Sequence, residues 1–352
     1  MSCNNQILFG IRLVQARKRN AWALRELADK LHGLVTAAAL SKYENGQMLP
    51  SPEVRLALYE TFGLPEDFFF RPLTARLGAV EFRKQSCLGR KEEGSIREVT
   101  ADFFERYAEL EELVGETARF ENPLEDFPVR NGEDVERAAC HLREAWQMGM
   151  GPIPSAVNLL EEHHILVHVL EAPKGFDGCA GMAGDRQSVA LNAGTPVDRR
   201  RFNALHELGH IVLKFEGVET KEREKLCHRF AGAMLLPEAK FRESFGERRQ
   251  HFAISELMEI KATHGISCAA ALFRAGDLGL IAAGTVQRTW MLFSTRGYRR
   301  KDPGDCPFDE TPRRFKRMLS RAVAENLISR DKGAVLAGQS EEEFRAQLEI
   351  FP

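Results

Sequence analysis

The sequence has few cysteines, and those it has form no recognisable pattern. Among its 352 residues there are seven, widely spaced and without a Cys-x-x-Cys pair: Cys3, Cys87, Cys140, Cys179, Cys227, Cys268 and Cys306. A disulfide framework in a small secreted protein uses an even number of cysteines at close spacing. We therefore exclude such a framework and expect reduced thiols in a cytoplasmic protein.

An excess of charge and a long apolar run are also missing. Lys and Arg number 49 and Asp and Glu number 51, which gives a formal net charge of −2. Any binding of nucleic acid must therefore come from a local surface. No segment approaches the roughly 18 apolar residues of a membrane helix, and the N-terminus lacks an apolar stretch with a cleavage site. We expect no membrane partner.

Internal repeats and low-complexity tracts are absent as well. Hydrophobic residues make up 43% of the chain and charged residues 28%, which is ordinary for a globular protein. The length suffices for two or three domains. The pattern predicts four parts: a helical domain over 1–73, a helical connector over 74–132, a mixed domain over 133–282 and a less legible C-terminal region over 283–352, which is a candidate sensor.

The part over 133–282 changes periodicity along its length. Two helical stretches, 133–149 and 154–163, precede an apolar alternating run over 165–170 that predicts a strand. A glycine-rich turn, a second short strand over 188–191 and a strongly apolar helix over 199–215 follow. The predicted fold class is therefore α+β and helix-rich: an all-α domain, then a domain with a small sheet.

The strongest chemical signal is His206-Glu207-Leu208-Gly209-His210, an HExxH motif. Positions i and i+4 of a helix share a face, so both imidazoles can reach one zinc ion, with Glu207 beside it as general base. Apolar neighbours predict that the helix is buried, where histidine and glutamate are costly without partners. The alternative is a pair of core histidines satisfied by hydrogen bonds.

A catalytic zinc usually has three protein ligands and one open position. The next predicted helix, KEREKLCHRFAGAMLLP, offers Glu222 and Glu224 as the third. Glu224 shares a helical face with Cys227, whereas Glu222 shares one with Leu226. Both faces are partly apolar, so periodicity alone favours neither glutamate.

The segments RRRFNALHELGHIVL and EKLCHRFAGAMLLP together resemble the ImmA/IrrE family of zinc metallopeptidases, and flanking segments extend the resemblance over about 133–282. The resemblance implies a zincin-like fold, Zn²⁺ as cofactor, and His206, His210 and Glu224 as its ligands. It implies metal-assisted amide hydrolysis in which Glu207 accepts a proton from water and passes it to the leaving amine. The sequence departs from the family at Cys227-His228, where alanine and asparagine are usual.

Two further roles in catalysis are hypotheses. His228 is a candidate donor to the oxyanion, against a purely packing role. The strand over 188–191 is a candidate site for an extended peptide substrate by strand addition, against an ordinary place within the sheet.

The segment ALRELADKLHGLVTAAALSKYENGQMLPS resembles a helix-turn-helix of the XRE type. The resemblance implies a first helix over 24–31, a turn at Gly33 and a recognition helix over 35–44. The residues expected to face the DNA groove are Thr36, Ala37, Ser41 and Lys42. Phosphate contacts are predicted for Arg12, Arg17, Lys18, Arg19 and Arg25. Proteins of this class usually bind palindromic DNA as homodimers.

The charge of this region is modest, with nine Lys/Arg against seven Asp/Glu over residues 1–74. Binding of a protein partner or dimerisation is therefore the alternative to DNA binding.

The C-terminal region carries a stripe of arginines at helical spacing beside Phe315: Arg313, Arg317 and Arg321. Such a stripe can bind single-stranded DNA, although an ordinary solvated helix face is the alternative. A thiol in zinc's open position would hold an enzyme inactive, and Cys87 and Cys306 are the candidates. Inert free thiols are the alternative.

Together these features predict a zinc endopeptidase fused to a helix-turn-helix. The family resemblance implies a helix-turn-helix repressor or antitoxin-like protein as the substrate, cut in trans or within the same chain, to derepress stress, DNA-damage or phage-defence genes. Single-stranded DNA is a candidate activator. The alternative is an XRE-family transcriptional regulator whose peptidase-like domain serves as a sensor or dimerisation module.

Overall fold

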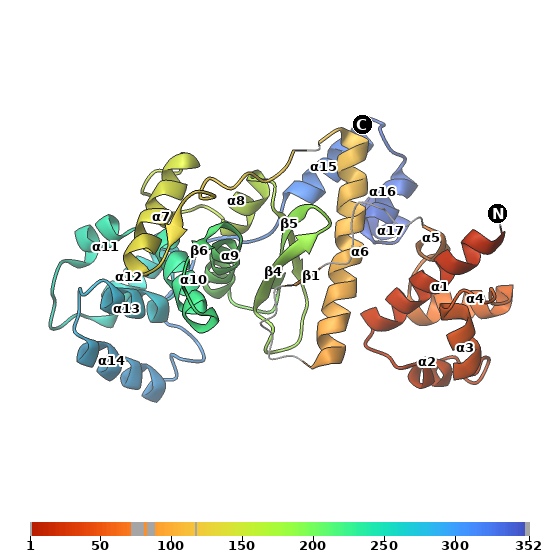
Figure 1. The fold of residues 1–352 in the computed structure, drawn as a ribbon, viewed down its shortest axis with the longest axis horizontal. Coiled ribbons are helices and arrows are strands. Elements are labelled where there is room, and N and C mark those ends of the chain that lie inside the picture. The colour runs from red at the N-terminus through yellow and green to blue at the C-terminus, as the bar shows by residue number, and fades with distance from the viewer. Residues whose placement is uncertain (1, 72–80, 83–88, 117, 349–352) are drawn as a thin grey trace. The chain divides into compact units, whose positions relative to one another are not determined.

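The computed structural model describes residues 2–71, 81–82, 89–116 and 118–348. These residues form 17 helices and six short strands, which confirms the helix-rich α+β class (Figure 1). Grouped by contacts, the chain makes two compact units: Met1–Ala118 with Gly181–Arg186 and Phe315–Pro352, and Arg119–Ala180 with Gln187–Arg314. The domain limits at 73, 132 and 282 stay predictions, because such grouping does not test which segments fold alone.

The first unit begins with five helices: α1 (Ser2–Arg19), α2 (Leu24–Lys30), α3 (Ala37–Glu44), α4 (Pro52–Phe62) and α5 (Glu66–Phe70). Local chemistry sets their limits. The Thr36 hydroxyl accepts the Ala39 N–H at 3.2 Å at the start of α3, and Ser51 caps α4 in the same way. Gly63 ends α4 with φ at 62°, a conformation that glycine adopts without strain. Their core includes Phe9, Leu13, Leu27, Leu40 and Leu58.

The long helix α6 (Arg90–Val114) packs on α1 within the same unit. Arg12 of α1 is fully buried and donates to Glu105 of α6 at 2.7 Å. The unit also holds β1 (Glu81–Phe82) and three C-terminal helices: α15 (Arg314–Ala324), α16 (Arg330–Ala337) and α17 (Glu341–Gln347). Helix α6 thus contacts the N-terminal helices through a buried ion pair.

The second unit is built on a small sheet. Strand β3 (Leu166–Leu170) pairs in parallel with β5 (Arg186–Asn192), with Leu166 opposite Ser188 and Leu170 opposite Asn192. On its other side β5 adjoins β4 (Gly178–Ala183). Because β5 has a strand on each side, the predicted strand addition at 188–191 is wrong. In the first unit, β1 pairs antiparallel with the far end of β4 at Gly181 and Met182.

Helices make up most of the second unit. They are α7 (Gly132–Ala145), α8 (Ala156–Glu162), α9 (Val197–Val212), α10 (Thr220–Leu235), α11 (Glu238–Phe245), α12 (Ile254–His264), α13 (Cys268–Asp277) and α14 (Ala283–Thr295). A two-stranded parallel pair, β2 (Pro128–Val129) and β6 (Lys214–Phe215), lies beside α7. Helix α10 packs along both α9 and α7 (Figure 1).

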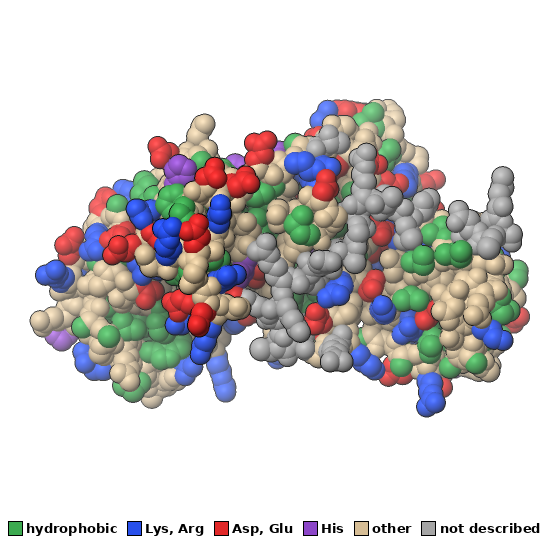
Figure 2. Space-filling model, in the orientation of Figure 1, with side chains coloured by type: hydrophobic (Ala, Val, Ile, Leu, Met, Phe, Trp, Pro, Cys, Tyr) green, Lys and Arg blue, Asp and Glu red, His purple; other side chains and the backbone are tan. Residues whose placement is uncertain are grey.

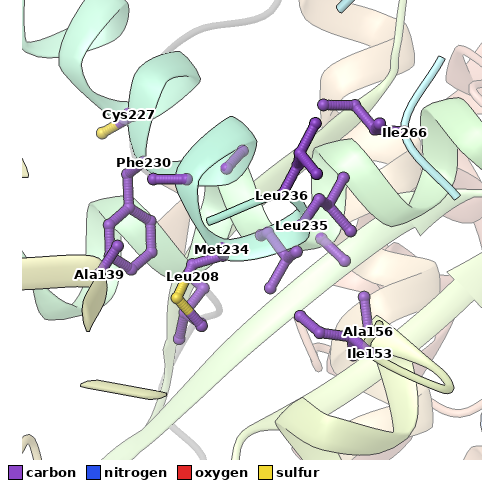
Figure 3. Packing of buried hydrophobic residues seen from close by; sticks show 14 of the residues in the cluster. Ala139, Ile153, Ala156, Leu208, Cys227, Phe230, Met234, Leu235, Leu236 and Ile266 are labelled. Atoms are coloured by element: carbon purple, nitrogen blue, oxygen red, sulfur yellow. The ribbon is translucent and has the colours of Figure 1, made fainter. Parts of the chain in front are cut away.

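The core of the second unit lies where α7, α9 and α10 meet. Ala139 of α7, Leu208 of α9 and Phe230 and Met234 of α10 belong to one buried cluster (Figure 3). The packing of apolar faces in this cluster fixes the spacing of α9 and α10. On the face drawn in Figure 2, Lys/Arg and Asp/Glu side chains are interspersed over α7, α10 and their neighbours, in keeping with a net charge of −2.

Candidate metal centre

Helix α9 positions the two histidines of the HExxH motif. His206 and His210 are four residues apart and therefore face the same side of the helix. Their Nε2 atoms lie 3.2 Å apart. The other face of α9 carries Leu205, Leu208 and Val212, all fully buried, so apolar packing fixes the direction in which the imidazoles point.

Helix α10 brings a carboxylate to the same point. Glu224 places Oε2 3.6 Å from Nε2 of His206 and Oε1 3.4 Å from Nε2 of His210. The ligand atoms of these three residues lie within 4.8 Å of one another, and no second group of this kind occurs in the described part of the chain. Glu222 is exposed and accepts from Lys225 at 2.8 Å. The packing of α10 on α9 thus favours Glu224 over Glu222 as the third ligand, a choice that helical periodicity alone could not make.

These three residues fit a zinc ion. Two imidazole nitrogens and one carboxylate oxygen are ligands that zinc prefers, and three protein ligands leave a fourth position open. Burial raises the pKa of Glu224, but the hydrogen bond from His206 and the neighbouring histidines outweigh burial and hold that pKa below its usual value. The carboxylate is therefore in the ionised form that metal binding requires.

Glu207 follows the first histidine and is buried. It lies against β4, because a Cβ added at Gly178 would be 3.6 Å from Cγ of Glu207. The same Cβ would be 2.9 Å from Cδ2 of Leu191 and 3.1 Å from the carbonyl oxygen of Ala190. The absent side chain at Gly178 therefore lets β4 lie close to both β5 and Glu207.

His228 lies beside the histidine pair. Its ring centroid is 4.2 Å from that of His206 and 5.8 Å from that of Phe202. The residue is exposed, yet desolvation by its packed neighbours, together with His206, lowers the pKa of His228 to about 4. The imidazole is neutral at pH 7 and retains one N–H that can donate.

Of the two candidate inhibitory thiols, the structure describes Cys306, and it does not join this cluster. No cysteine belongs to the group of ligand atoms among the described residues. Cys306 is half-buried, and its electrostatic neighbours include Asp198 and Arg201 in the first two turns of α9; burial raises the pKa of its thiol. Cys87 lies outside the described residues.

The arginine stripe is largely engaged with carboxylates. Arg313 pairs with Asp309 at 2.6 Å, and Arg321 donates to Glu325 at 2.9 Å. Arg317 is exposed. Phe315 packs against the rings of Phe103 and Tyr107, at 5.1 Å from each. A role in binding single-stranded DNA stays a prediction for this stripe.

The candidate DNA-binding residues divide into two groups. Thr36 and Lys42 are exposed on α3 or at its start, and Ala37 and Ser41 are partly exposed. Basic side chains of α1 instead form ion pairs within the unit. Arg17 donates to both carboxylate oxygens of Glu44, at 2.6 and 2.9 Å, and Arg19 lies 3.5 Å from Asp102. Their phosphate contacts stay predictions, as do those of Lys18 and exposed Arg25. The contact predicted for Arg12 is wrong, because Arg12 is fully buried and donates to Glu105.

Two relationships near the centre had no clear signal in the sequence. Cys227 Sγ lies 3.5 Å from Nδ1 of His210, on the side of the ring away from Glu224. Glu310 forms a fully buried ion pair with Arg201 of α9. The sequence showed that Cys227 departs from the family pattern, but it did not show that Cys227 contacts His210. The ion pair of Glu310 with Arg201 joins residues far apart in the chain, so no local pattern predicts it.

Comparison with known families agrees with the geometry. Residues 161–275 match the IrrE N-terminal-like domain, peptidase family M78, and residues 13–69 match a helix-turn-helix domain. The chain thus carries the two modules that the sequence motifs indicated. The peptidase family implies a metal and a protein substrate, and the helix-turn-helix implies DNA. No curated protein matches the chain. No helix among the described residues is long and apolar enough to cross a membrane.

Proposed function

We propose that this chain is a zinc-dependent endopeptidase with a DNA-binding module. The observation that carries the proposal is the meeting of Glu224 with His206 and His210, all inside the segment that matches the peptidase family. His206, His210 and Glu224 would hold the zinc ion. When bound, zinc supplies Lewis acidity toward a carbonyl oxygen and toward water.

The protein's own groups supply the proton transfers. Glu207, next to the histidine pair, accepts the proton of the attacking water and gives it to the leaving amine. His228, neutral and 4.2 Å from the His206 ring, donates its N–H to the developing oxyanion. A purely structural zinc site has no need of Glu207, so its presence favours catalysis.

The substrate proposed is a protein segment in extended form. Strand β4 begins at Gly178, beside Glu207, and its pairing with β1 is described only at Gly181 and Met182, whereas β5 is paired with β3 at 188–192. A peptide that pairs with β4 near Gly178 would bring its backbone toward Glu207. This replaces 188–191 by β4 as the strand that binds substrate.

The biological target proposed is a helix-turn-helix repressor or antitoxin-like protein, and the consequence is derepression of stress, DNA-damage or phage-defence genes. The support is the pairing of a helix-turn-helix module over 13–69 with the peptidase module in one chain. The DNA-binding face would be α3, through Thr36, Ala37, Ser41 and Lys42, in a homodimer. Single-stranded DNA is the proposed activator.

The alternative is a transcriptional regulator in which the peptidase module only senses or dimerises. The helix-turn-helix match supports both functions. The variant Glu207→Gln separates them, because it leaves all three ligands in place. If proteolysis is the function, the variant keeps about one zinc per chain and loses regulation of its target genes. Unchanged regulation by Glu207→Gln would establish the alternative.

A further inference from the structure

The two histidines of the metal centre differ in what lies behind their rings. Nδ1 of His210 is 3.5 Å from Sγ of Cys227, a hydrogen-bonding distance for sulfur. Nδ1 of His206 is buried and has no hydrogen-bond partner among the described residues. Cys227 is itself fully buried on α10, three residues after Glu224. The centre therefore has one histidine oriented by a thiol and one that is not.

Helix packing holds the thiol against this ring. Gly209 lies beside His210 on α9, and a Cβ added there would be 3.4 Å from both Cα and Cβ of Cys227 and 3.2 Å from Cδ1 of Phe230. The lack of a side chain at Gly209 thus allows α10 to approach α9 at the level of Cys227. The contact between thiol and imidazole follows from the core that fixes both helices.

The chemistry of a ligand histidine gives this contact a consequence. An imidazole that presents Nε2 to a metal carries its proton on Nδ1, and the group that accepts this proton fixes the tautomer and the ring orientation. Sulfur accepts such a bond weakly. We infer that Cys227 is a positioning residue for the metal: its Sγ accepts the Nδ1–H of His210 and aims Nε2 at the ion. This inference rests on the proposed zinc site.

The test is the zinc affinity of the full chain, measured by competition with a chromophoric chelator. Cys227→Ala removes the acceptor and is expected to weaken zinc binding about 10- to 100-fold, the usual effect of losing such a partner. Cys227→Ser restores an acceptor on the same Cβ and is expected to recover most of the loss. The matched control is Cys268→Ala, another fully buried thiol, which donates to the Pro303 carbonyl at 3.4 Å. It should bind zinc as the wild type does.

A second measurement separates orientation from packing. In the zinc-loaded protein the ¹⁵N resonance of His210 Nδ1 should shift in Cys227→Ala and stay in place in Cys268→Ala. Equal zinc affinities for the wild type and a folded Cys227→Ala, or equal losses in Cys227→Ala and Cys227→Ser, would overturn the inference. Absence of zinc from the wild type would overturn the proposed function instead, so the two failures are distinguishable.

Discussion

Glu310 and Arg201 form an ion pair in which neither side chain is exposed. The carboxylate also accepts from the Ser155 hydroxyl at 3.0 Å and from the N–H groups of Ala156 and Val157 at 3.0 and 2.7 Å, so it caps helix α8. Arg201 lies 4.0 Å from the centre of the Phe308 ring. The segment before α15 therefore supports α9, the helix that carries His206 and His210.

The first prediction concerns the stability that this pair confers. Arg201→Ala leaves Glu310 charged and buried, and we expect a loss of about 3–5 kcal/mol in the free energy of unfolding. The matched control is Arg313→Ala, because Arg313 pairs with Asp309 while its side chain is 64% exposed. That change should cost at most about 1 kcal/mol. Urea unfolding followed by circular dichroism measures both, and equal losses would contradict the account.

The second prediction concerns the third ligand. Glu224→Gln removes the carboxylate that lies 3.4 Å from His210, whereas Glu222→Gln removes one that pairs with exposed Lys225. We expect zinc affinity to fall more than about 100-fold in Glu224→Gln, which exceeds the effect of losing a residue that only supports a ligand. In Glu222→Gln we expect zinc affinity to be unchanged. Metal analysis after dialysis against a weak chelator provides the measurement. Loss of zinc from Glu222→Gln alone would show that the wrong glutamate was assigned.

The third prediction concerns pH. Asp134 accepts the N–H of Arg130 at 2.9 Å, and this bond, with a second from Arg137, lowers its pKa. A carboxyl group whose pKa is lower in the folded state stabilises the fold above its unfolded pKa of about 3.9, and that contribution disappears as the pH falls through the folded value.

Asp134→Asn should therefore be less stable than the wild type at pH 7, and the difference should shrink as the pH falls below about 4. Urea midpoints measured from pH 7 to pH 2.5 test this, with Asp305→Asn at an exposed position as the control. A difference that stays constant over the whole range would refute the role given to the charge.

The fourth prediction concerns DNA. Lys42 is exposed on α3 and has no ion-pair partner among the described residues, whereas Lys18 lies 3.9 Å from Glu98. Lys42→Gln should weaken binding to a random-sequence duplex and reduce the slope of log affinity against log salt by about 0.9, the value for one lost phosphate contact. Lys18→Gln should leave that slope nearly unchanged. Fluorescence anisotropy at several salt concentrations distinguishes the two, and an unchanged slope for Lys42→Gln would remove this contact from the interface.

Relationships between residues close together in the sequence could be predicted, and those between residues far apart in the sequence could not. The pairing of His206 with His210 follows from helical periodicity alone and was predicted directly. The choice between Glu222 and Glu224 needed the packing of α10 on α9, since both glutamates lie on partly apolar faces. Family resemblance gave the answer that periodicity could not.

Longer-range relationships had no local signal. Arg201 and Glu310 are 109 residues apart, and neither segment has a sequence pattern that predicts their ion pair. The arginines of α1 looked available for phosphate because the sequence does not show that carboxylates of α6 lie beside them, as Asp102 does beside Arg19. The interior position of β5 could not be predicted from the sequence either, because strand order is set only when the sheet assembles.

The central claim is hydrolysis of a protein substrate that depends on Glu207, and intact mass spectrometry tests it most directly. The zinc-loaded wild type and Glu207→Gln, matched for zinc content, would be incubated with a helix-turn-helix repressor from the same genome, with and without single-stranded DNA. The account predicts two repressor fragments, or two fragments of the chain itself, whose masses sum to that of the parent plus one water, from the wild type only. An intact repressor and an intact chain in every wild-type reaction, or equal cleavage by Glu207→Gln, would contradict it.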